Sequence, residues 1–216
     1  MFLDLHCHSV SSDDSRATVE QFLKWIVALR KRGHQIDGLV LTEHRKFDRN
    51  VSYSPLSNEY GIVILKGSEL DTAHGHFLVF GVNDQLTGEV DFSHIRMDSK
   101  ELVRAAHDSG AIAVPAHPGR VGIGLVNFLQ EGVDLSRIPV VEGLNGSARE
   151  GENAMAQQLA KDHSLKMTGG SDAHFVSGFG ISMTEFKVDI RNEQDLVHQL
   201  YEGSFWPVRL EETLSK

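Results

Sequence analysis

The chain has 216 residues, of which 21 are basic and 30 are acidic, and its formal net charge is -9. Hydrophobic residues make up 40% of the chain, so it can bury one sizeable core, and we expect a single domain over residues 1–216. The acidic balance argues against nonspecific binding to duplex DNA, which requires many cations against the phosphates.

The sequence also lacks membrane and export signals. No apolar run approaches the roughly 18 residues that a spanning helix needs, and the N-terminal MFLDLHCHS has no basic segment before a long apolar stretch. We therefore expect a cytoplasmic protein with no membrane partner. Cys7 is the only cysteine, which excludes an intramolecular disulfide, and we expect its thiol to be buried.

Predicted strands and helices alternate along the chain. Residues 2–5 form the first predicted strand, and Thr18 with Gln21 resembles a capping box that opens a helix to about Arg32. GLVLT at 38–42 is the second strand, which completes a β-α-β unit.

The same alternation continues through the rest of the chain. Asp98 and Gly110 mark the ends of one predicted helix. Strands alternating with helices predict a mainly parallel sheet, and about seven such units would close into an α/β fold of the distorted (β/α)7 TIM-like barrel type. The further strands are predicted at 62–65, 77–82, 111–115, 139–144 and just before Gly169, and the further helices at 150–162 and 192–203.

Histidines and carboxylates stand just after five of these strands. In parallel barrels the carboxyl ends of the strands converge on one mouth, and imidazole with carboxylate is the ligand chemistry of zinc, manganese and iron. We therefore predict a multinuclear metal site. Only His76 precedes its strand. The candidate ligands are His6, His8, Asp13, His44, Glu69, His76, His117, Asp172 and His174.

Each motif is less specific when it is taken alone. The His6-x-His8 pair on a strand places two imidazoles on one face, but such a pair also occurs in a satisfied core. In GGSDAH at 169–174, an ordinary turn capped by an Asx side chain explains Ser171 and Asp172 and leaves His174 without a role. The prediction of a multinuclear metal site therefore rests on all the motifs together.

Seven motifs occur in one order between Asp4 and His174: DLHCHSVSSDD, LTEH, GSELD, GHFLVFG, AHPGR, VEGLNG and GGSDAH. This order resembles the polymerase and histidinol phosphatase (PHP) family of metal-dependent phosphoesterases. The resemblance implies a distorted seven-unit barrel with two or three divalent ions (Zn, Mn or Fe), and it implies catalytic roles for Glu69 and Asp172. It assigns His6, His8, Glu69 and Asp172 to one ion, Glu69, His76 and His117 to a second, and Asp13, His44 and His174 to a third.

Two positions depart from the family pattern. Glu43 and Asp14 stand where many relatives have the aspartate of TDH and the glycine of SDG. We expect Glu43 to accept a hydrogen bond from a ligand, and Asp14 to alter the loop that carries Asp13.

Phosphate chemistry requires positive and donor groups besides the ions. Water held between two cations ionises near neutral pH and attacks phosphorus in line. Arg120 offers two parallel donors to a phosphate, or is an ordinary solvated loop arginine. Asn145 donates to substrate at the barrel mouth, or is a turn residue beside Gly146. The expected partner is a small phosphomonoester or nucleotide.

Two other functions compete with this one. An amidohydrolase-type C–N hydrolase also begins with H-x-H after the first strand, but it typically uses two metals and a carboxylated lysine or similar bridge, so the additional Asp13, His44 and His174 count against it. A non-catalytic barrel module would be favoured by lost ligands, and none of the nine candidates is missing.

Overall fold

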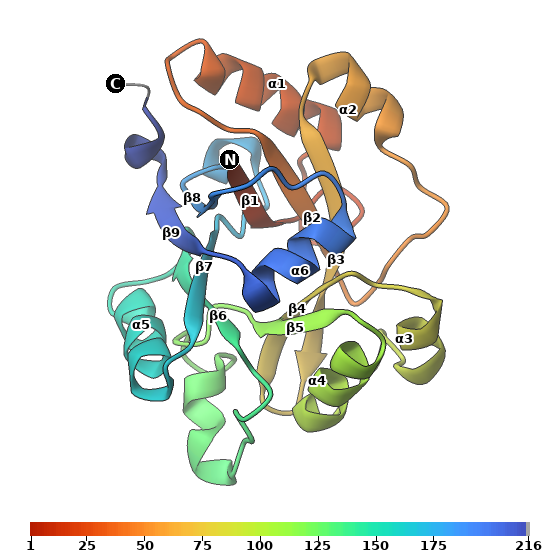
Figure 1. Ribbon diagram of the computed structural model, residues 1–216, viewed down its shortest axis with the longest axis vertical. Coiled ribbons are helices and arrows are strands. Elements are labelled where there is room, and N and C mark those ends of the chain that lie inside the picture. Colours follow the sequence, from red (N-terminus) through yellow and green to blue (C-terminus); the bar gives the residue numbers. More distant parts are fainter. Residues whose placement is uncertain (215–216) are drawn as a thin grey trace.

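The computed structural model describes residues 1–214 and contains a curled, mixed sheet of seven strands in the order β5-β4-β3-β2-β1-β8-β9 (Figure 1). A separate pair, β6 and β7, runs parallel. The strands are β1 (Phe2–Cys7), β2 (Gly38–His44), β3 (Val63–Thr72), β4 (Gly75–Phe80), β5 (Ile112–Pro115), β6 (Val140–Asn145), β7 (Lys166–Gly170), β8 (Ser182–Phe186) and β9 (Phe205–Arg209).

The α/β class is as predicted, but a complete (β/α)7 barrel is not formed. β1, β2 and β3 are parallel, whereas β4 runs antiparallel to both β3 and β5, and β8 runs antiparallel to β1 and β9. The turn from Thr72 to Gly75 explains the first reversal, because a parallel neighbour would need a crossover of a dozen or more residues. The sheet is therefore a half-barrel, against which β6 and β7 pack near β5 and β1.

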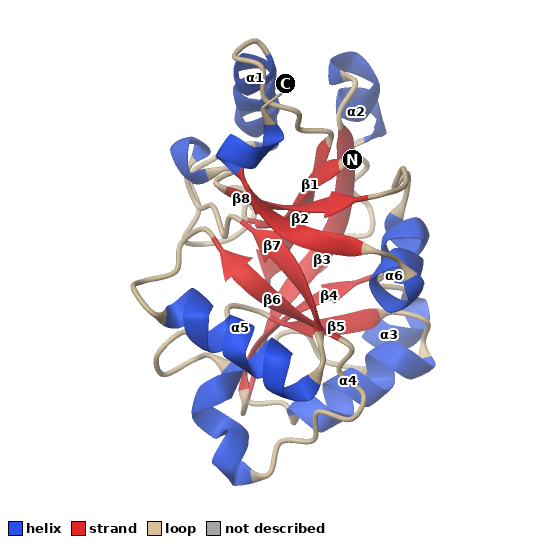
Figure 2. Cartoon of the chain, turned by 60° about the vertical axis from the view of Figure 1, so that its left-hand side comes forward, coloured by secondary structure: helices blue, strands red, loops and turns tan. Residues whose placement is uncertain are grey.

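Helices lie around the outside of the strands (Figure 2). The capping box of Thr18 and Gln21 is present, Asp98 caps α4, and Asn192 caps α6. The two short helices α2 and α3 and the strands β8 and β9 were not predicted. The α-helices are α1 (Val19–Arg30), α2 (Ser54–Tyr60), α3 (Asp84–Glu89), α4 (Ser99–Asp108), α5 (Glu152–His163) and α6 (Glu193–Glu202), and 3-10 turns cover Leu125–Glu131, Val176–Gly178 and Leu210–Thr213.

The core is layered. Alternate residues of the strands, among them Leu5, Val40 and Val114, form one buried cluster that includes Leu196 and Leu200 of α6. Two further clusters lie beneath α4 and α1 on the outer side of the sheet. Cys7 is buried as expected, and its thiol donates to the carbonyl of Val40. Among residues 1–214, no helix combines the length and apolar character needed to cross a membrane.

Candidate metal centre

The parallel strands bring their ligands to one edge. His44 at the end of β2 is the ladder partner of Glu69 on β3, and His6 lies near the end of β1, next to β2. His76 begins β4, opposite Asp71 of β3. Because β4 is antiparallel, its first residues lie beside the carboxyl end of β3, which explains why a ligand that precedes its predicted strand still reaches this edge.

Four ligand atoms converge at the centre of this edge. Nε2 of His6 lies 3.1 Å from Nε2 of His8, 3.2 Å from Oε2 of Glu69 and 3.5 Å from Oδ1 of Asp172. Nε2 of His8 lies 3.3 and 3.6 Å from the same two oxygens. A tetrahedral ion with bonds of about 2.0–2.2 Å separates its ligands by about 3.3–3.6 Å, so the four residues fit one transition-metal ion.

Glu69 also faces a second group through its other oxygen. Oε1 lies 3.0 Å from Nδ1 of His76 and 2.9 Å from Nε2 of His117, and these three residues form a second set of potential ligands. Glu69 is 1% exposed, so its carboxylate has no competing contact with bulk water. One carboxylate shared by two ligand sets is the arrangement that the resemblance implied for Glu69.

The third group differs from the expected one in two ways, since His8 joins it and Asp14 takes the place of Asp13. His8, His44 and His174 come together, and Oδ2 of Asp14 lies 3.2 Å from Nε2 of both His44 and His174, which are 3.3 Å apart. Asp13 lies outside this group: its side chain is 78% exposed and faces Arg45. The structure therefore joins eight of the nine expected ligands, and it places Asp14 where we expected Asp13.

This placement leads to a test with a built-in control. Asp14→Asn is expected to lower the affinity of the most weakly held ion by about tenfold, because it removes an anionic oxygen from between two imidazoles. Asp13→Asn is the matched control and should leave all ion affinities within about twofold, since an exposed carboxylate contributes little. Metal titration followed by elemental analysis measures both variants, and the reverse order of effects would restore Asp13 as the ligand.

The charges of the cluster call for a cation. Burial alone would lower the pKa of His6, but Glu142, Asp172 and Glu69 outweigh it and raise that pKa well above its usual value. Burial alone would raise the pKa of Glu69, yet the histidines around it, His6 foremost, hold that pKa well below its usual value. The carboxylates of the cluster thus favour positive charge next to them, and divalent ions would supply such charge when bound.

Two ring nitrogens near the centre lack hydrogen-bond partners. Nδ1 of His44 and Nδ1 of His117 are buried and have no hydrogen-bond partner. Nδ1 of His44 does lie 3.2 Å from Oε2 of Glu69, but the orientation does not make a hydrogen bond. The atom of His117 that faces Glu69 is Nε2, and the atom of His44 that faces His174 and Asp14 is also Nε2. The fit of these residues to metal ions therefore rests on the spacing of the facing atoms.

Two buried carboxylates, Glu142 and Asp4, were not predicted from the sequence, and both hold candidate ligands in place. Oε1 of Glu142 lies 3.0 Å from Nδ1 of His6, and its Oε2 accepts the backbone N–H of His117 at 2.6 Å. Asp4 accepts the backbone N–H groups of His6 and Ser171, and burial raises its pKa to about 6. The sequence did contain a signal for Glu142. A single acidic residue inside the apolar run VVEGL is not explained as an ordinary surface residue.

Local backbone geometry is unusual at three positions of the centre. His117 and Asp172 have φ of 30° and 55°, a region that costs non-glycine residues free energy and that clusters at functional sites. At Gly170 an added Cβ would collide with Cβ of His6 and approach Oε1 of Glu142 to 2.8 Å. The second glycine of GGSDAH is therefore required by the close approach of β7 to His6.

The two predicted substrate residues lie together beside Asp172. Nη2 of Arg120 donates to Oδ2 of Asp172 at 2.7 Å and to Oδ1 of Asn145 at 3.1 Å. Asn145 is 2% exposed and also donates to Glu142 and Asp172. Both residues thus orient Asp172, and the reading of Arg120 as a freely solvated arginine is wrong.

Glu43 acts one step farther from the centre than expected. Its carboxylate accepts hydrogen bonds from the hydroxyls of Ser9 and Ser12 at 2.5 and 2.6 Å and from no candidate ligand among the described residues. The hydroxyl of Ser12 in turn accepts the backbone N–H of His44. Glu43 therefore fastens the loop after β1 to β2, and it reaches the ligands only through serine.

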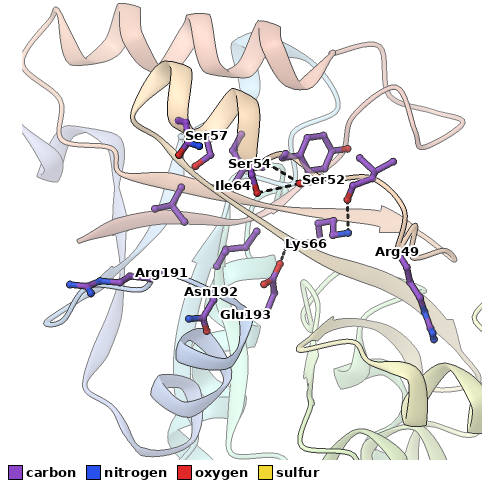
Figure 3. Close-up of a pocket in the computed structure, with 14 residues that line it drawn as sticks. Arg49, Ser52, Ser54, Ser57, Ile64, Lys66, Arg191, Asn192 and Glu193 are labelled. Atoms are coloured by element: carbon purple, nitrogen blue, oxygen red, sulfur yellow. Dashed lines mark hydrogen bonds between the residues drawn. The ribbon is translucent and has the colours of Figure 1, made fainter.

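One sizeable cavity of the described chain lies away from the candidate metal centre. It has a volume of about 500 Å³, lies on the outer side of β3 between α2 and α6, and is lined by none of the candidate ligands (Figure 3). Lys66 is engaged by the carbonyls of Asp48 and Val51, and Arg49 and Arg191 point away from each other. These cations do not converge on a ligand.

Comparison with known proteins agrees with the motif resemblance. The PHP-associated family model matches residues 150–205. An uncharacterized protein of Methanocaldococcus jannaschii is 27% identical over 138 residues, which cover 61% of this chain and 55% of that protein. The chain thus spans about half the length of this curated relative.

Solved structures share the fold. A two-domain protein from Bacteroides vulgatus that contains a predicted PHP-like metal-dependent phosphoesterase matches 98% of this chain and 65% of its own length, with 23% identity and a TM-score of 0.64. A lesion-specific endonuclease from Pyrococcus furiosus matches 95% of this chain and 57% of its own length, with 16% identity and a TM-score of 0.67. An amidohydrolase from Chromobacterium violaceum matches 80% of this chain and 87% of its own length, with 18% identity and a TM-score of 0.56.

The fold and the clusters of potential ligands together define an α/β protein with side chains suited to hold metal ions. The C-terminal match to the PHP-associated family model and the PHP-like neighbours agree with the resemblance to the PHP family.

Proposed function

We propose that the protein is a metal-dependent phosphoesterase that hydrolyses a small phosphomonoester or nucleotide. One observation carries this proposal: Glu69 joins two ligand sets, one of which has tetrahedral spacing. When bound there, two or three divalent ions would supply Lewis-acid chemistry, which polarises a phosphoryl group and neutralises charge on the departing oxygen.

The residues of the chain have separate tasks in this proposal. The carboxylate of Glu69 would hold two neighbouring ions, and Asp172 would complete one ligand set. Arg120 already donates to Asp172; the rest of its fork of N–H groups is available to orient a phosphate oxygen. Asn145 keeps Asp172 in place from the buried side.

The size of the substrate follows from charge and shape. With a net charge of -9, the protein has few means of following a polynucleotide backbone, whereas an ion-filled centre attracts a compact dianion. A cavity of about 380 Å³ beside Asp172 and His174 is at the lower end of the range for small-molecule sites.

Metal analysis combined with a substrate panel tests the proposal. After reconstitution with manganese or zinc, elemental analysis is expected to find two or three ions per chain, since three ligand sets are present. Phosphomonoesters and nucleotides should be hydrolysed faster than duplex DNA or long RNA, with weak dependence on salt. One ion or fewer per chain would contradict the shared centre, and full metal loading without ester hydrolysis would contradict the activity.

The amidohydrolase alternative shares the fold but not the predicted bridge. Glu69 stands at the position between two ligand sets where that class typically has a carboxylated lysine. Lys66, the lysine on the same strand, donates to backbone carbonyls away from the centre. Cyclic amides and dipeptides in the same panel decide between these chemistries, and a barrel without catalysis would hydrolyse none of the compounds.

A further inference from the structure

The cavity next to the candidate metal centre is lined by both charged and apolar side chains. The cavity of about 380 Å³ shares Asp172 and His174 with the ligand sets, and its lining also includes Val121, Ile123 and Arg149. The cavity is therefore continuous with the place where a phosphate would be held, and a group attached to that phosphate can extend into it.

The apolar part of this wall is exposed. Val121 is 71% exposed and Ile123 is 38% exposed, and both flank Gly122, whose φ of 84° forms the turn. Single exposed apolar side chains are common, but here two of them line one cavity beside a charged centre. An apolar group placed against them would remove their surface from water, which is favourable.

A buried carboxylate fixes the two sides of the cavity relative to each other. Glu152, which begins α5, is 4% exposed. Its Oε1 accepts the backbone N–H of Val121 at 3.2 Å, and its Oε2 accepts the backbone N–H of Arg149 at 2.8 Å. Gly119 packs so closely on the backbone of Glu152 that no Cβ would fit there. The cavity is thus held open before any ligand arrives.

Arg149 contributes a planar cation. Its guanidinium makes no hydrogen bond or ion pair with another residue of the described chain, although Arg120 on the same cavity is engaged by Asp172. A guanidinium without a carboxylate partner stacks favourably on an aromatic face, and it does so less well on an aliphatic chain.

We propose that this cavity binds the leaving group of the phosphoester and selects an aromatic one. The proposal rests on the function proposed above. Hydrolysis forms a bond between the oxygen of water and phosphorus and breaks the ester P–O bond, and the alcohol leaves with a proton from that water. The aromatic part of this alcohol lies between Val121, Ile123 and Arg149 while the phosphate lies on the ions.

Binding of two phosphonates, which cannot be hydrolysed at phosphorus, tests the cavity without relying on turnover. Metal-loaded protein is expected to bind 3-phenylpropylphosphonate about tenfold more tightly than propylphosphonate in calorimetry, because only the first can cover the apolar wall. Equal affinities would overturn the proposal.

Variants locate the preference. The double variant Val121→Ser with Ile123→Ser should reduce the preference to about twofold or less and leave propylphosphonate binding unchanged. Arg149→Ala should weaken binding of the phenyl compound by about threefold. Val188→Ser is the control, since Val188 is 46% exposed but does not line this cavity; it should keep the full preference. Loss of the preference in the control alone would overturn the assignment.

A pair of substrates separates this inference from the proposed function. 3-Phenylpropyl phosphate and propyl phosphate release alcohols of similar acidity, so their intrinsic reactivity is matched. Hydrolysis of both esters at the same kcat/KM would overturn the cavity assignment and leave the phosphoesterase function intact. Hydrolysis of neither ester by fully loaded protein would overturn the function as well.

Discussion

Replacing Glu69 with glutamine is expected to lower phosphoester turnover by about a thousandfold or more while the protein still folds. Oε2 of Glu69 lies within 3.3 Å of ring nitrogens of His6, His8 and His44, and Oε1 faces two more histidines. An amide keeps the volume of this side chain but removes the negative charge that separates neighbouring ions, so both ligand sets that share it are weakened together.

The readouts for Glu69→Gln are turnover, metal content and circular dichroism on the same preparation. Glu101→Gln is the matched control, because Glu101 is exposed on α4 and belongs to none of the ligand sets; it should retain full activity. Activity of Glu69→Gln near that of the parent protein, with two ions still bound, would show that the shared carboxylate is assigned wrongly.

The sequence predicted which side chains converge better than it predicted the strands. His6, His44, Glu69 and His117 follow apolar runs, and parallel strand ends meet at one edge whatever the number of strands, so their convergence did not depend on a closed barrel. The error at β3 has a physical cause. The last seven of its ten residues, KGSELDT, are largely polar because this stretch carries a candidate ligand and reaches the centre, so periodicity ended the strand at Leu65 although it continues to Thr72.

The hairpin between β3 and β4 was hidden for the same reason. Thr72 and Gly75 enclose a two-residue turn, but the flanking Asp71 and His76 are functional side chains that break the alternation expected of paired strands. β8 and β9 were missed because SMTEF and FWPVR are short, and the second contains proline, which reads against a strand and is tolerated near a sheet edge.

Asp13 and Asp14 show a limit of a different kind. Two adjacent carboxylates differ by one residue in sequence, and which one turns inward depends on the loop that Glu43 ties down through Ser9 and Ser12. No periodicity governs such a loop. The resemblance to the family favoured Asp13, whereas in this chain the carboxylate of Asp14 lies beside His44 and His174.

Glu142→Gln is expected to reduce metal affinity by about 10–100-fold without touching any candidate ligand atom. Glu142 is 1% exposed and serves three donors at once: the ring of His6, the backbone N–H of His117 and the amide of Asn145. Glutamine has one acceptor oxygen in place of two. Whichever way its amide turns, it therefore sets an N–H group against one of these donors, and His6 or His117 loses the partner that orients it.

The same change is expected to destabilise the metal-free protein by about 1–3 kcal/mol, the cost of a buried polar group left without its partner. Metal titration and urea unfolding measure the two effects separately, and Glu185→Gln, at a half-buried glutamate of β8, is the control for both. A loss of stability with unchanged metal affinity would make Glu142 a residue of the core. Loss of affinity in Glu142→Gln but not in Glu185→Gln would instead show that the centre depends on an acid on β6, which contributes no atom to any of the three ligand sets.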